Sequence, residues 1–324
     1  MRSFFLMRAA LVASVLLIMV GTTGHVVAAP VAAADITALP VTERMVWAGD
    51  VELFVRATGG RDGGPALVMV NGGPGLTHDY LEALEDELAS IRLRVVTYDQ
   101  RGTGRSTAPS SPDYSLTAYV RDLSAVRAAL NIEQLHLLGH SFGGLVTQAY
   151  TAAHPNRVRS LTLAASEPTD PRAAAAGDRR FDRRILLLTG TGQIPDPIPP
   201  VDGDDCSAQL AAITPAFFAD PDFVPQPGTV ATECRQNVID QTTNTITNDV
   251  LADVQARLGR YRGPALLVMG RGDPFGPAWG IRPQQSALSS ADVSVALIRG
   301  AGHLPWLEST RFVPIVHSFL VRST

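Results

Sequence analysis

The chain has 324 residues, of which 45% are hydrophobic and 18% charged, and its 27 basic and 31 acidic residues give a formal net charge of −4. This length and composition are typical of a globular protein with one large domain and an insertion. The sequence has no basic stripe and no basic run interleaved with aromatic residues, so we do not expect it to bind nucleic acid.

Residues 1–34 have the pattern of a secretory signal peptide. Two arginines supply a positive amino-terminal region, residues 9–20 form an apolar run, and alanines at 28–29 and 32–34 offer cleavage sites. The apolar run is too short for an ordinary membrane span. We therefore expect a secreted or periplasmic (cell-envelope) protein that has no stable membrane association once the signal is cleaved. The alternative is an uncleaved amino-terminal anchor.

Apolar runs alternate with helical patterns through most of the remaining chain. Residues 51–55 alternate like an early antiparallel strand. A continuous apolar run at 66–70 is typical of a buried parallel strand, and the mainly apolar segments 94–98, 135–138, 158–165, 264–269 and 293–298 are predicted as further strands. Helical periodicity occurs at 115–130 and 309–321. This alternation predicts an α/β fold, in which helices cover both faces of a mostly parallel sheet.

Residues 168–262 break the alternation, and we interpret them as an inserted, mainly helical cap after the sixth strand. The segment opens with Asp, Pro, Arg and Ala, and its helical patterns are weaker. The apolar pair Phe217-Phe218 favours a folded insertion over a disordered loop. The core domain then comprises residues 35–167 and 263–324.

Both cysteines of the chain, Cys206 and Cys234, lie in this insertion. An even number of cysteines in an exported chain predicts a disulfide, which would close a loop of about 28 residues and stabilise the fold by roughly 3–4 kcal/mol. A metal site would need more ligands, and no histidine occurs between residues 155 and 302. We therefore expect neither a metal nor another cofactor.

The sequence Gly-His-Ser-Phe-Gly at residues 139–143 is the most informative stretch. It follows a predicted strand and precedes a helical segment, which is the setting of a nucleophile elbow with Ser141 at its apex. The flanking glycines are needed because so sharp a turn leaves no room for neighbouring Cβ atoms. The serine hydroxyl then stands beside a helix amino terminus, whose dipole favours a developing oxyanion. The alternative is a flexible Gly/Ser turn without chemistry.

A nucleophilic serine needs a base and an acid that orients the base. His303 follows the last predicted strand and Asp273 follows the one before it, so both lie at the strand ends where such sheets form their sites. We expect His303 Nε2 to take the Ser141 proton while its Nδ1–H bonds Asp273, in the chain order Ser, Asp, His. Asp99 is the main competitor as the acid. His140 neighbours the nucleophile but is expected to point away from it.

Acyl transfer also requires hydrogen-bond donors for the oxyanion. One is the backbone N–H of Phe142, directly after the nucleophile. The second is expected from the Asn-Gly-Gly-Pro-Gly turn at residues 71–75, with Gly73 as the candidate; the alternative is a tight turn that holds no ligand. The loop at residues 99–106 is expected to support this turn, with Asp99 and the arginines tying the loop in place. It lacks the full glycine pattern of a phosphate-binding loop.

Together these motifs resemble the α/β-hydrolase superfamily and, more narrowly, the proline iminopeptidase (prolyl aminopeptidase) branch of the serine peptidases. That branch has a His-Gly-Gly-Pro-Gly turn, an Asp-Gln-Arg-Gly-x-Gly-Arg-Ser loop and a Gly-x-Ser-x-Gly elbow, similar to residues 71–75, 99–106 and 139–143. The similarity covers about residues 45–166 and 263–320 and hardly reaches the cap. It implies an α/β-hydrolase fold with a mostly parallel, eight-stranded sheet.

The resemblance also bears on substrate binding. Asn71 stands where the branch has a histidine, which leaves the backbone of the turn intact. Aminopeptidases of this branch hold the free amine of the substrate with cap acids. Glu167, at the end of the sixth predicted strand, is the candidate substrate-binding residue, whereas Glu233, beside Cys234, is more simply an exposed acid.

The residues and the resemblance together imply a secreted serine hydrolase with an acyl-enzyme mechanism and a small-molecule or short-peptide substrate. Our first hypothesis is an aminopeptidase of the proline iminopeptidase type that releases amino-terminal residues from short peptides. It predicts unpaired carboxylates in the pocket. A second hypothesis is a carboxylesterase for small, uncharged esters. A third is a non-catalytic, ligand-binding homologue.

Overall fold

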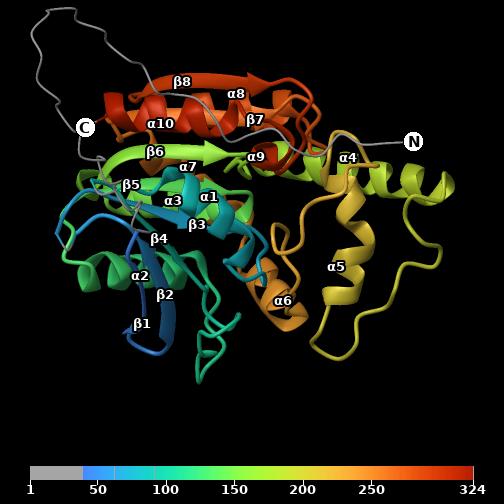
Figure 1. Cartoon of the computed structure of the whole chain (residues 1–324), viewed down its shortest axis with the longest axis horizontal. Helices are drawn as coiled ribbons and strands as arrows, with labels where there is room; N and C mark the ends of the chain where they lie inside the picture. The colour runs from blue at the N-terminus through green and yellow to red at the C-terminus, as the bar shows by residue number, and fades with distance from the viewer. Residues whose placement is uncertain (1–38, 62, 91, 324) are drawn as a thin grey trace, which may run out of the picture. The chain divides into compact units, whose positions relative to one another are not determined.

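Eight strands form a single mixed sheet in the computed structural model, which describes residues 39–61, 63–90 and 92–323. The predicted signal peptide lies outside the described residues. In space the strands run in the order β1-β2-β4-β3-β5-β6-β7-β8 (Figure 1). Their bounds are β1 Val41–Trp47, β2 Glu52–Thr58, β3 Ala66–Val70, β4 Arg94–Tyr98, β5 Leu135–His140, β6 Val158–Ala164, β7 Pro264–Gly270 and β8 Asp292–Ile298.

The sheet is parallel except at one edge, which confirms the predicted fold class. β1 pairs antiparallel with β2 and β2 with β4, whereas all the remaining pairs are parallel. The sequence analysis did not predict β1. Nearly all of its side chains are exposed, apolar ones such as Met45 and Trp47 included, so no inside–outside alternation marks it as a strand.

Helices cover both faces of the sheet, as predicted. One face carries α2 (Leu116–Ala129), α3 (Phe142–Ala153), α7 (Asn248–Leu258) and α8 (Pro277–Ala287), and the other carries α1 (Glu82–Leu88) and α10 (Phe312–Arg322). The strand period of two divides the side chains between the two cores. In β3, Val68 and Val70 pack in the first core, whereas Leu67 and Met69 pack in the second.

The segment between β6 and β7 carries most of the structure that lies outside these layers. Its elements are α4 (Pro171–Gly190), α5 (Ser207–Ile213), the 3₁₀ helix η3 (Thr214–Phe217), α6 (Gln236–Thr245) and α7. The helices α4, α5 and α6 lie beyond the ends of the parallel strands, whereas α7 packs against α3 beside the sheet (Figure 1). The division of this segment into core and cap stays a prediction.

The predicted disulfide between Cys206 and Cys234 is present, with Cα atoms 5.0 Å apart. The remaining short elements are η1 (Asp79–Leu81), η2 (Pro155–Arg157) and α9 (Pro305–Glu308). Within the described ranges, no helix combines the length and apolarity needed to cross a bilayer, and no cluster of three or more His, Cys, Asp or Glu side chains is arranged to hold a metal ion.

Candidate active site

Ser141 occupies a strained turn between β5 and α3, as the elbow motif predicts. Its φ of 55° and ψ of −123° are rare for a residue with a Cβ atom. A Cβ atom on Gly139 would collide with Thr147, and one on Gly143 would collide with the carbonyl of Val70. Only glycine fits at these two positions, which explains the glycines of the motif.

The elbow is tied to the end of β6 by its main chain. Ser141 N–H donates to the carbonyl of Ala164 at 3.2 Å, and Glu167 N–H donates to the carbonyl of Ser141 at 3.0 Å. Because both peptide groups of Ser141 are held in this way, the direction of its Cα–Cβ bond is fixed at the amino terminus of α3.

His303 and Asp273 form a hydrogen-bonded pair beside the elbow. His303 Nδ1 lies 3.1 Å from Asp273 Oδ2, and both side chains are buried. An ionised carboxylate only accepts, so this bond places the proton on Nδ1 and leaves Nε2 free to accept a proton. Asp273 is oriented in turn by Phe275 N–H, which donates to its Oδ1 at 3.0 Å. The competing acid, Asp99, makes no such pair with His303.

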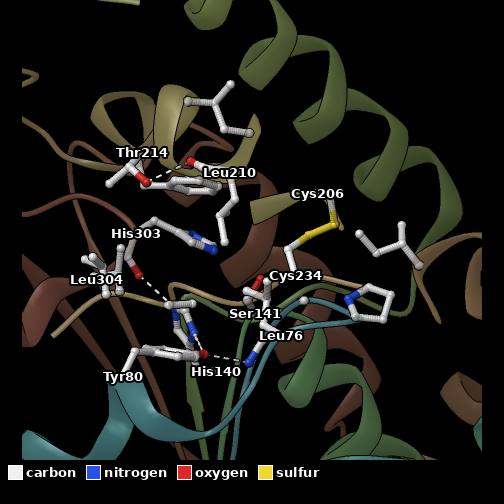
Figure 2. Close-up of a pocket in the computed structure, with 18 of the residues that line it drawn as sticks. Leu76, Tyr80, His140, Ser141, Cys206, Leu210, Thr214, Cys234, His303 and Leu304 are labelled. Atoms are coloured by element: carbon white, nitrogen blue, oxygen red, sulfur yellow. Dashed lines mark hydrogen bonds between the residues drawn. A yellow bond between two sulfur atoms is a disulfide. The ribbon is translucent and has the colours of Figure 1, made fainter. Parts of the chain in front are cut away.

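Ser141 and His303 both line a cavity of about 250 Å³. In Figure 2 the His303 ring and the Ser141 hydroxyl face the same space. The described residues show no direct hydrogen bond between these two side chains; in substrate-free sites such bonds are often long and tighten only on binding. The structure therefore brings the predicted nucleophile and base to one cavity, and the predicted acid is bonded to the base.

The turn at residues 71–75 borders the same cavity. Gly73 has a φ of +125°, which favours glycine, and it lines the cavity wall. Asn71 closes the turn, because its Nδ2 donates to the carbonyls of Gly72 at 3.0 Å and Leu76 at 2.8 Å. Gly72 N–H is already engaged by the hydroxyl of Tyr80 at 2.6 Å. Among the described residues the N–H groups of Gly73 and Phe142 have no such partner, so they are the donors that could hold an oxyanion.

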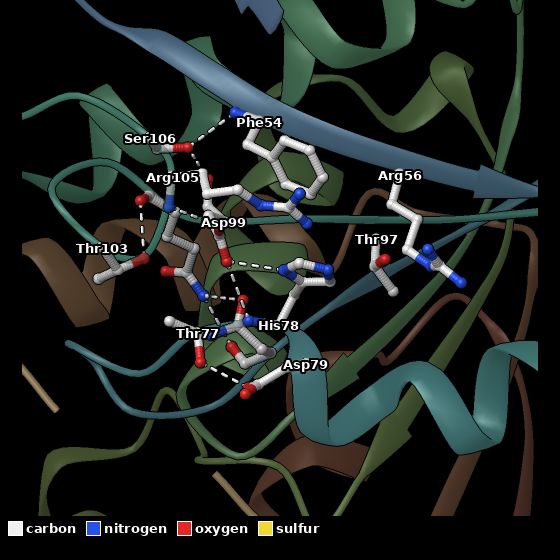
Figure 3. A network of polar contacts seen from close by, with 12 residues as sticks. Phe54, Arg56, Thr77, His78, Asp79, Thr97, Asp99, Thr103, Arg105 and Ser106 are labelled. Carbon is white, nitrogen blue, oxygen red and sulfur yellow. Dashed lines mark hydrogen bonds and ion pairs between the residues drawn. The ribbon is translucent and has the colours of Figure 1, made fainter. Parts of the chain in front are cut away.

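The loop at residues 99–106 lies against this turn. Gln100 Nε2 donates to the backbone carbonyl of Asn71 at 2.7 Å. Asp99 instead accepts from the ring and backbone N–H groups of His78, which follows the turn (Figure 3). Arg101 bonds Asp122 on α2. The expected support is therefore present, and Gln100 provides its direct contact.

Glu167 lies next to the nucleophile in the chain fold, but its side chain is not among the residues that line the cavity. It is partly buried, and its carboxylate has no hydrogen bond or ion pair within the described part of the chain. Burial, and secondly the charge of Asp178, raise its pKa from 4.5 to about 7. Glu233, by contrast, is exposed, as expected.

The cavity wall opposite the sheet comes from the segment between β6 and β7, called the insertion below. Its side chains are almost all apolar, and no carboxylate is among the described residues that line it; the insertion contributes Leu210, Ile213, Phe217, Val230, Ala231 and Ile239. The disulfide Cys206–Cys234 is itself part of this wall. Sequence reasoning noticed the two cysteines and Phe217, as part of an apolar pair, but assigned none of these residues to a cavity wall.

The disulfide also lies against the turn that carries Gly73. Cys234 forms a β-bridge with Leu76, and Arg235 N–H donates to the carbonyl of Gly75 at 2.9 Å. On its other side, Cys206 directly precedes α5. The bond therefore connects the α5 wall of the cavity to the expected oxyanion turn.

Comparisons with known proteins agree with this geometry. Residues 65–310 match the family model described as "alpha/beta hydrolase fold". The chain is 26% identical over 298 residues to a proline iminopeptidase of Lactobacillus helveticus, covering 83% of this chain and 94% of the relative. It is 36% identical over 124 residues to a proline iminopeptidase of Clostridium botulinum, covering 38% of this chain and 41% of the relative.

Solved structures give a similar result. A proline iminopeptidase of Mycobacterium smegmatis superposes with a TM-score of 0.59 at 25% identity, covering 87% of this chain and 98% of that one. An esterase of Exiguobacterium antarcticum shares the fold, with a TM-score of 0.57 at 19% identity, covering 86% of this chain and all of that one. The chain therefore belongs to the α/β-hydrolase fold family and is distantly related to the proline iminopeptidases.

Proposed function

We propose that the protein is a serine hydrolase that works through an acyl-enzyme. Ser141 Oγ attacks the substrate carbonyl while His303 Nε2 takes its proton and then passes it to the leaving group. Asp273 holds the ring and stabilises the imidazolium, and the oxyanion lies between the N–H groups of Gly73 and Phe142. A water molecule, activated by the same histidine, then releases the acyl group.

The observation that carries this proposal is the meeting of three features at one cavity. These are the strained elbow at Ser141, the His303–Asp273 pair, and the turn that presents the Gly73 N–H. A fluorophosphonate should label the wild-type protein at Ser141 and leave Ser141→Ala unlabelled. Absence of labelling in the folded wild type would refute the hydrolase proposal and favour a non-catalytic, ligand-binding protein.

For the substrate, we put an aminopeptidase of the proline iminopeptidase type first. The distant proline iminopeptidase relatives support it, and so does Glu167, an unpaired carboxylate one backbone hydrogen bond from the nucleophile. A substrate ammonium placed beside Glu167 would gain a charged partner and lower the carboxylate's pKa. Prolyl p-nitroanilide should then be cleaved, and N-acetyl-prolyl p-nitroanilide, whose amine is blocked, should not.

A second candidate is a carboxylesterase for small apolar esters. It is favoured by the cavity, which is apolar on its cap side and has no carboxylate among its described lining residues. Cleavage of p-nitrophenyl butyrate without cleavage of prolyl p-nitroanilide would select this candidate.

Glu167→Gln separates the two candidates further, with the exposed Glu233→Gln as its matched control. In an aminopeptidase the Glu167 variant should raise KM for prolyl p-nitroanilide about 10-fold or more, whereas the control should not. In an esterase neither substitution should change KM for p-nitrophenyl butyrate.

We further infer that the enzyme works outside the cytoplasm. The signal-like sequence of residues 1–34 and the disulfide support this. Mass spectrometry of protein recovered from the culture medium or cell envelope should find an amino terminus close to residue 29 or 35. Recovery of full-length protein from the cytoplasm alone would contradict this inference.

A further inference from the structure

A continuous chain of buried hydrogen bonds connects the oxyanion turn to the loop that carries the base. Gly72 N–H bonds the hydroxyl of Tyr80 at 2.6 Å, this hydroxyl lies 2.7 Å from His140 Nδ1, and His140 Nε2 lies 3.0 Å from the backbone carbonyl of His303. Figure 2 shows the Tyr80–His140 and His140–His303 bonds. All the groups involved are buried.

The partners fix the direction of every bond in this chain. The carbonyl of His303 only accepts, so His140 Nε2 carries a proton and donates it. Nδ1 of the neutral ring therefore accepts, and Tyr80 donates its only hydroxyl proton to it. The oxygen of Tyr80 is then left to accept from Gly72 N–H. His140 is thus held in a single tautomer, and any other arrangement leaves a buried group without a partner.

Aromatic packing holds the same residues. The Trp306 ring stacks on Tyr80 at 6.3 Å between centroids and meets the edge of His140 at 4.8 Å. Burial, and secondly the neighbouring His303, keep the pKa of His140 well below its ordinary value. A neutral ring suits this place, because its centroid is only 4.9 Å from that of His303, which becomes positive during the reaction.

We propose that Tyr80 and His140 are positioning residues that set the oxyanion turn and the base at a fixed separation. The proposal rests on the acyl-enzyme chemistry proposed above. The turn and the His303 loop are more than 200 residues apart in the chain, and the side chains of Tyr80 and His140 link their main chains. Because Tyr80 holds the N–H of Gly72, it fixes the peptide next to the Gly73 donor. Oxyanion donors are effective when they already point at the position that the oxyanion will occupy before it forms.

Tyr80→Phe tests the first residue, since it removes one oxygen and keeps the ring. Phosphonylation of Ser141 by a fluorophosphonate should slow about 10- to 100-fold, because the adduct uses the same donors as the oxyanion. The affinity of butylboronic acid, which forms a tetrahedral adduct with the serine, should fall by a similar factor. KM should change far less than kcat for whichever p-nitrophenyl ester or p-nitroanilide the enzyme accepts.

Tyr261→Phe is the matched control for this variant. Tyr261 is also buried, and its hydroxyl donates to the carbonyl of Pro264 at 3.0 Å, at the opposite end of β7 from the site. The Tyr261→Phe variant should lose a comparable amount of thermal stability. Its rate of phosphonylation, its kcat and its affinity for butylboronic acid should not change. Equal effects of the two substitutions on phosphonylation would mean that the Tyr80 hydroxyl is merely structural.

His140 is tested by a pair of variants. His140→Gln retains one acceptor and one donor and should keep phosphonylation within about 3-fold of wild type, whereas His140→Phe should slow it about 10- to 100-fold. His136→Phe is the control, because His136 is buried on the same strand and bonds Ser160. The double variant Tyr80→Phe/His140→Phe should be no slower than the slower single variant, as expected for one connected unit.

The results separate this inference from the proposed function. If wild type is not phosphonylated, the proposed function is wrong. If wild type reacts, and Tyr80→Phe and His140→Phe react at the wild-type rate, the positioning role is wrong. Should Tyr80→Phe fail to fold by circular dichroism, the two His140 variants decide the question by themselves, since the inference requires Gln to preserve the rate that Phe loses.

Discussion

The two sides of the cavity are built in different ways. On the sheet side, backbone geometry defines the site. The serine is strained, glycines stand where a Cβ atom would collide, and hydrogen bonds hold the peptide groups in place. On the side of the insertion, apolar side chains and a disulfide form a wall with no required residue type. We therefore expect the chemistry to depend on the sheet side and the choice of substrate to depend on the side of the insertion.

The largest effect is expected from removal of the Ser141 hydroxyl, on the sheet side of the cavity. Ser141→Ala should lower kcat about 10⁴-fold or more while the protein remains folded, because it removes the hydroxyl that we propose as the nucleophile. Turnover of the accepted p-nitrophenyl ester or p-nitroanilide measures the loss. The exposed Ser289→Ala is the control and should keep full activity. Retained turnover in Ser141→Ala would place the reaction elsewhere.

A slightly smaller effect is expected when the base loses its orienting acid. Asp273→Asn should lower kcat about 10³- to 10⁴-fold, because an amide NH₂ at this place favours the proton on His303 Nε2, where it blocks the base. Binding of a substrate analogue should change little. Asp99→Asn is informative beside it: a comparable loss of kcat with unchanged stability would make Asp99 the acid.

Removal of the disulfide tests whether the insertion influences the rate of the reaction. Cys206→Ser/Cys234→Ser should lose roughly 3–4 kcal/mol of unfolding free energy, measured by urea denaturation. It should also lower kcat/KM roughly 10-fold at a temperature where it is folded, because the bond connects α5 to the turn that carries Gly73. A reductant should inhibit wild type to the same degree and leave the double variant unaffected. A stable, fully active double variant would show that the two sides are independent.

The same contrast explains how much could be predicted from the sequence. The predicted strands at 66–70 and 94–98 coincide with β3 and β4, because strands buried on both faces are largely apolar. Ser141 was identifiable because glycines flank it at two positions where a Cβ atom would collide. The pairing of Asp273 with His303 followed from their places at the ends of neighbouring strands.

Other parts of the site leave no such mark in the sequence. Many combinations of apolar residues build an equivalent wall, so Leu210 and Ile213 could not be distinguished from ordinary helix residues. Tyr80 has the same sequence appearance as any core tyrosine, because its role depends on one hydroxyl placed between two distant segments. The disulfide was predictable as a bond, but its place in the cavity wall depends on the fold of the whole insertion.

The smallest effect concerns Glu167, which lies where the sheet meets the insertion. Its pKa of about 7 is above its ordinary value of 4.5, so the folded protein holds the proton more tightly than the unfolded chain does. Its ionisation therefore destabilises the fold progressively as pH rises from about 4.5 through about 7. Glu167→Gln cannot ionise, so it should match wild type in unfolding free energy at pH 4. At pH 8 it should be more stable by about 1–2 kcal/mol, an amount reduced by the partial exposure of the group.

Urea denaturation at the two pH values measures this difference, and Glu233→Gln, at an exposed site, should show none. Asp178 on α4 contributes to the raised pKa, so Asp178→Asn should reduce the pH-dependent gap between Glu167→Gln and the glutamate form. A gap that is the same at pH 4 and pH 8 would mean that Glu167 is paired or well hydrated. It would then lack the free carboxylate on which the aminopeptidase hypothesis depends.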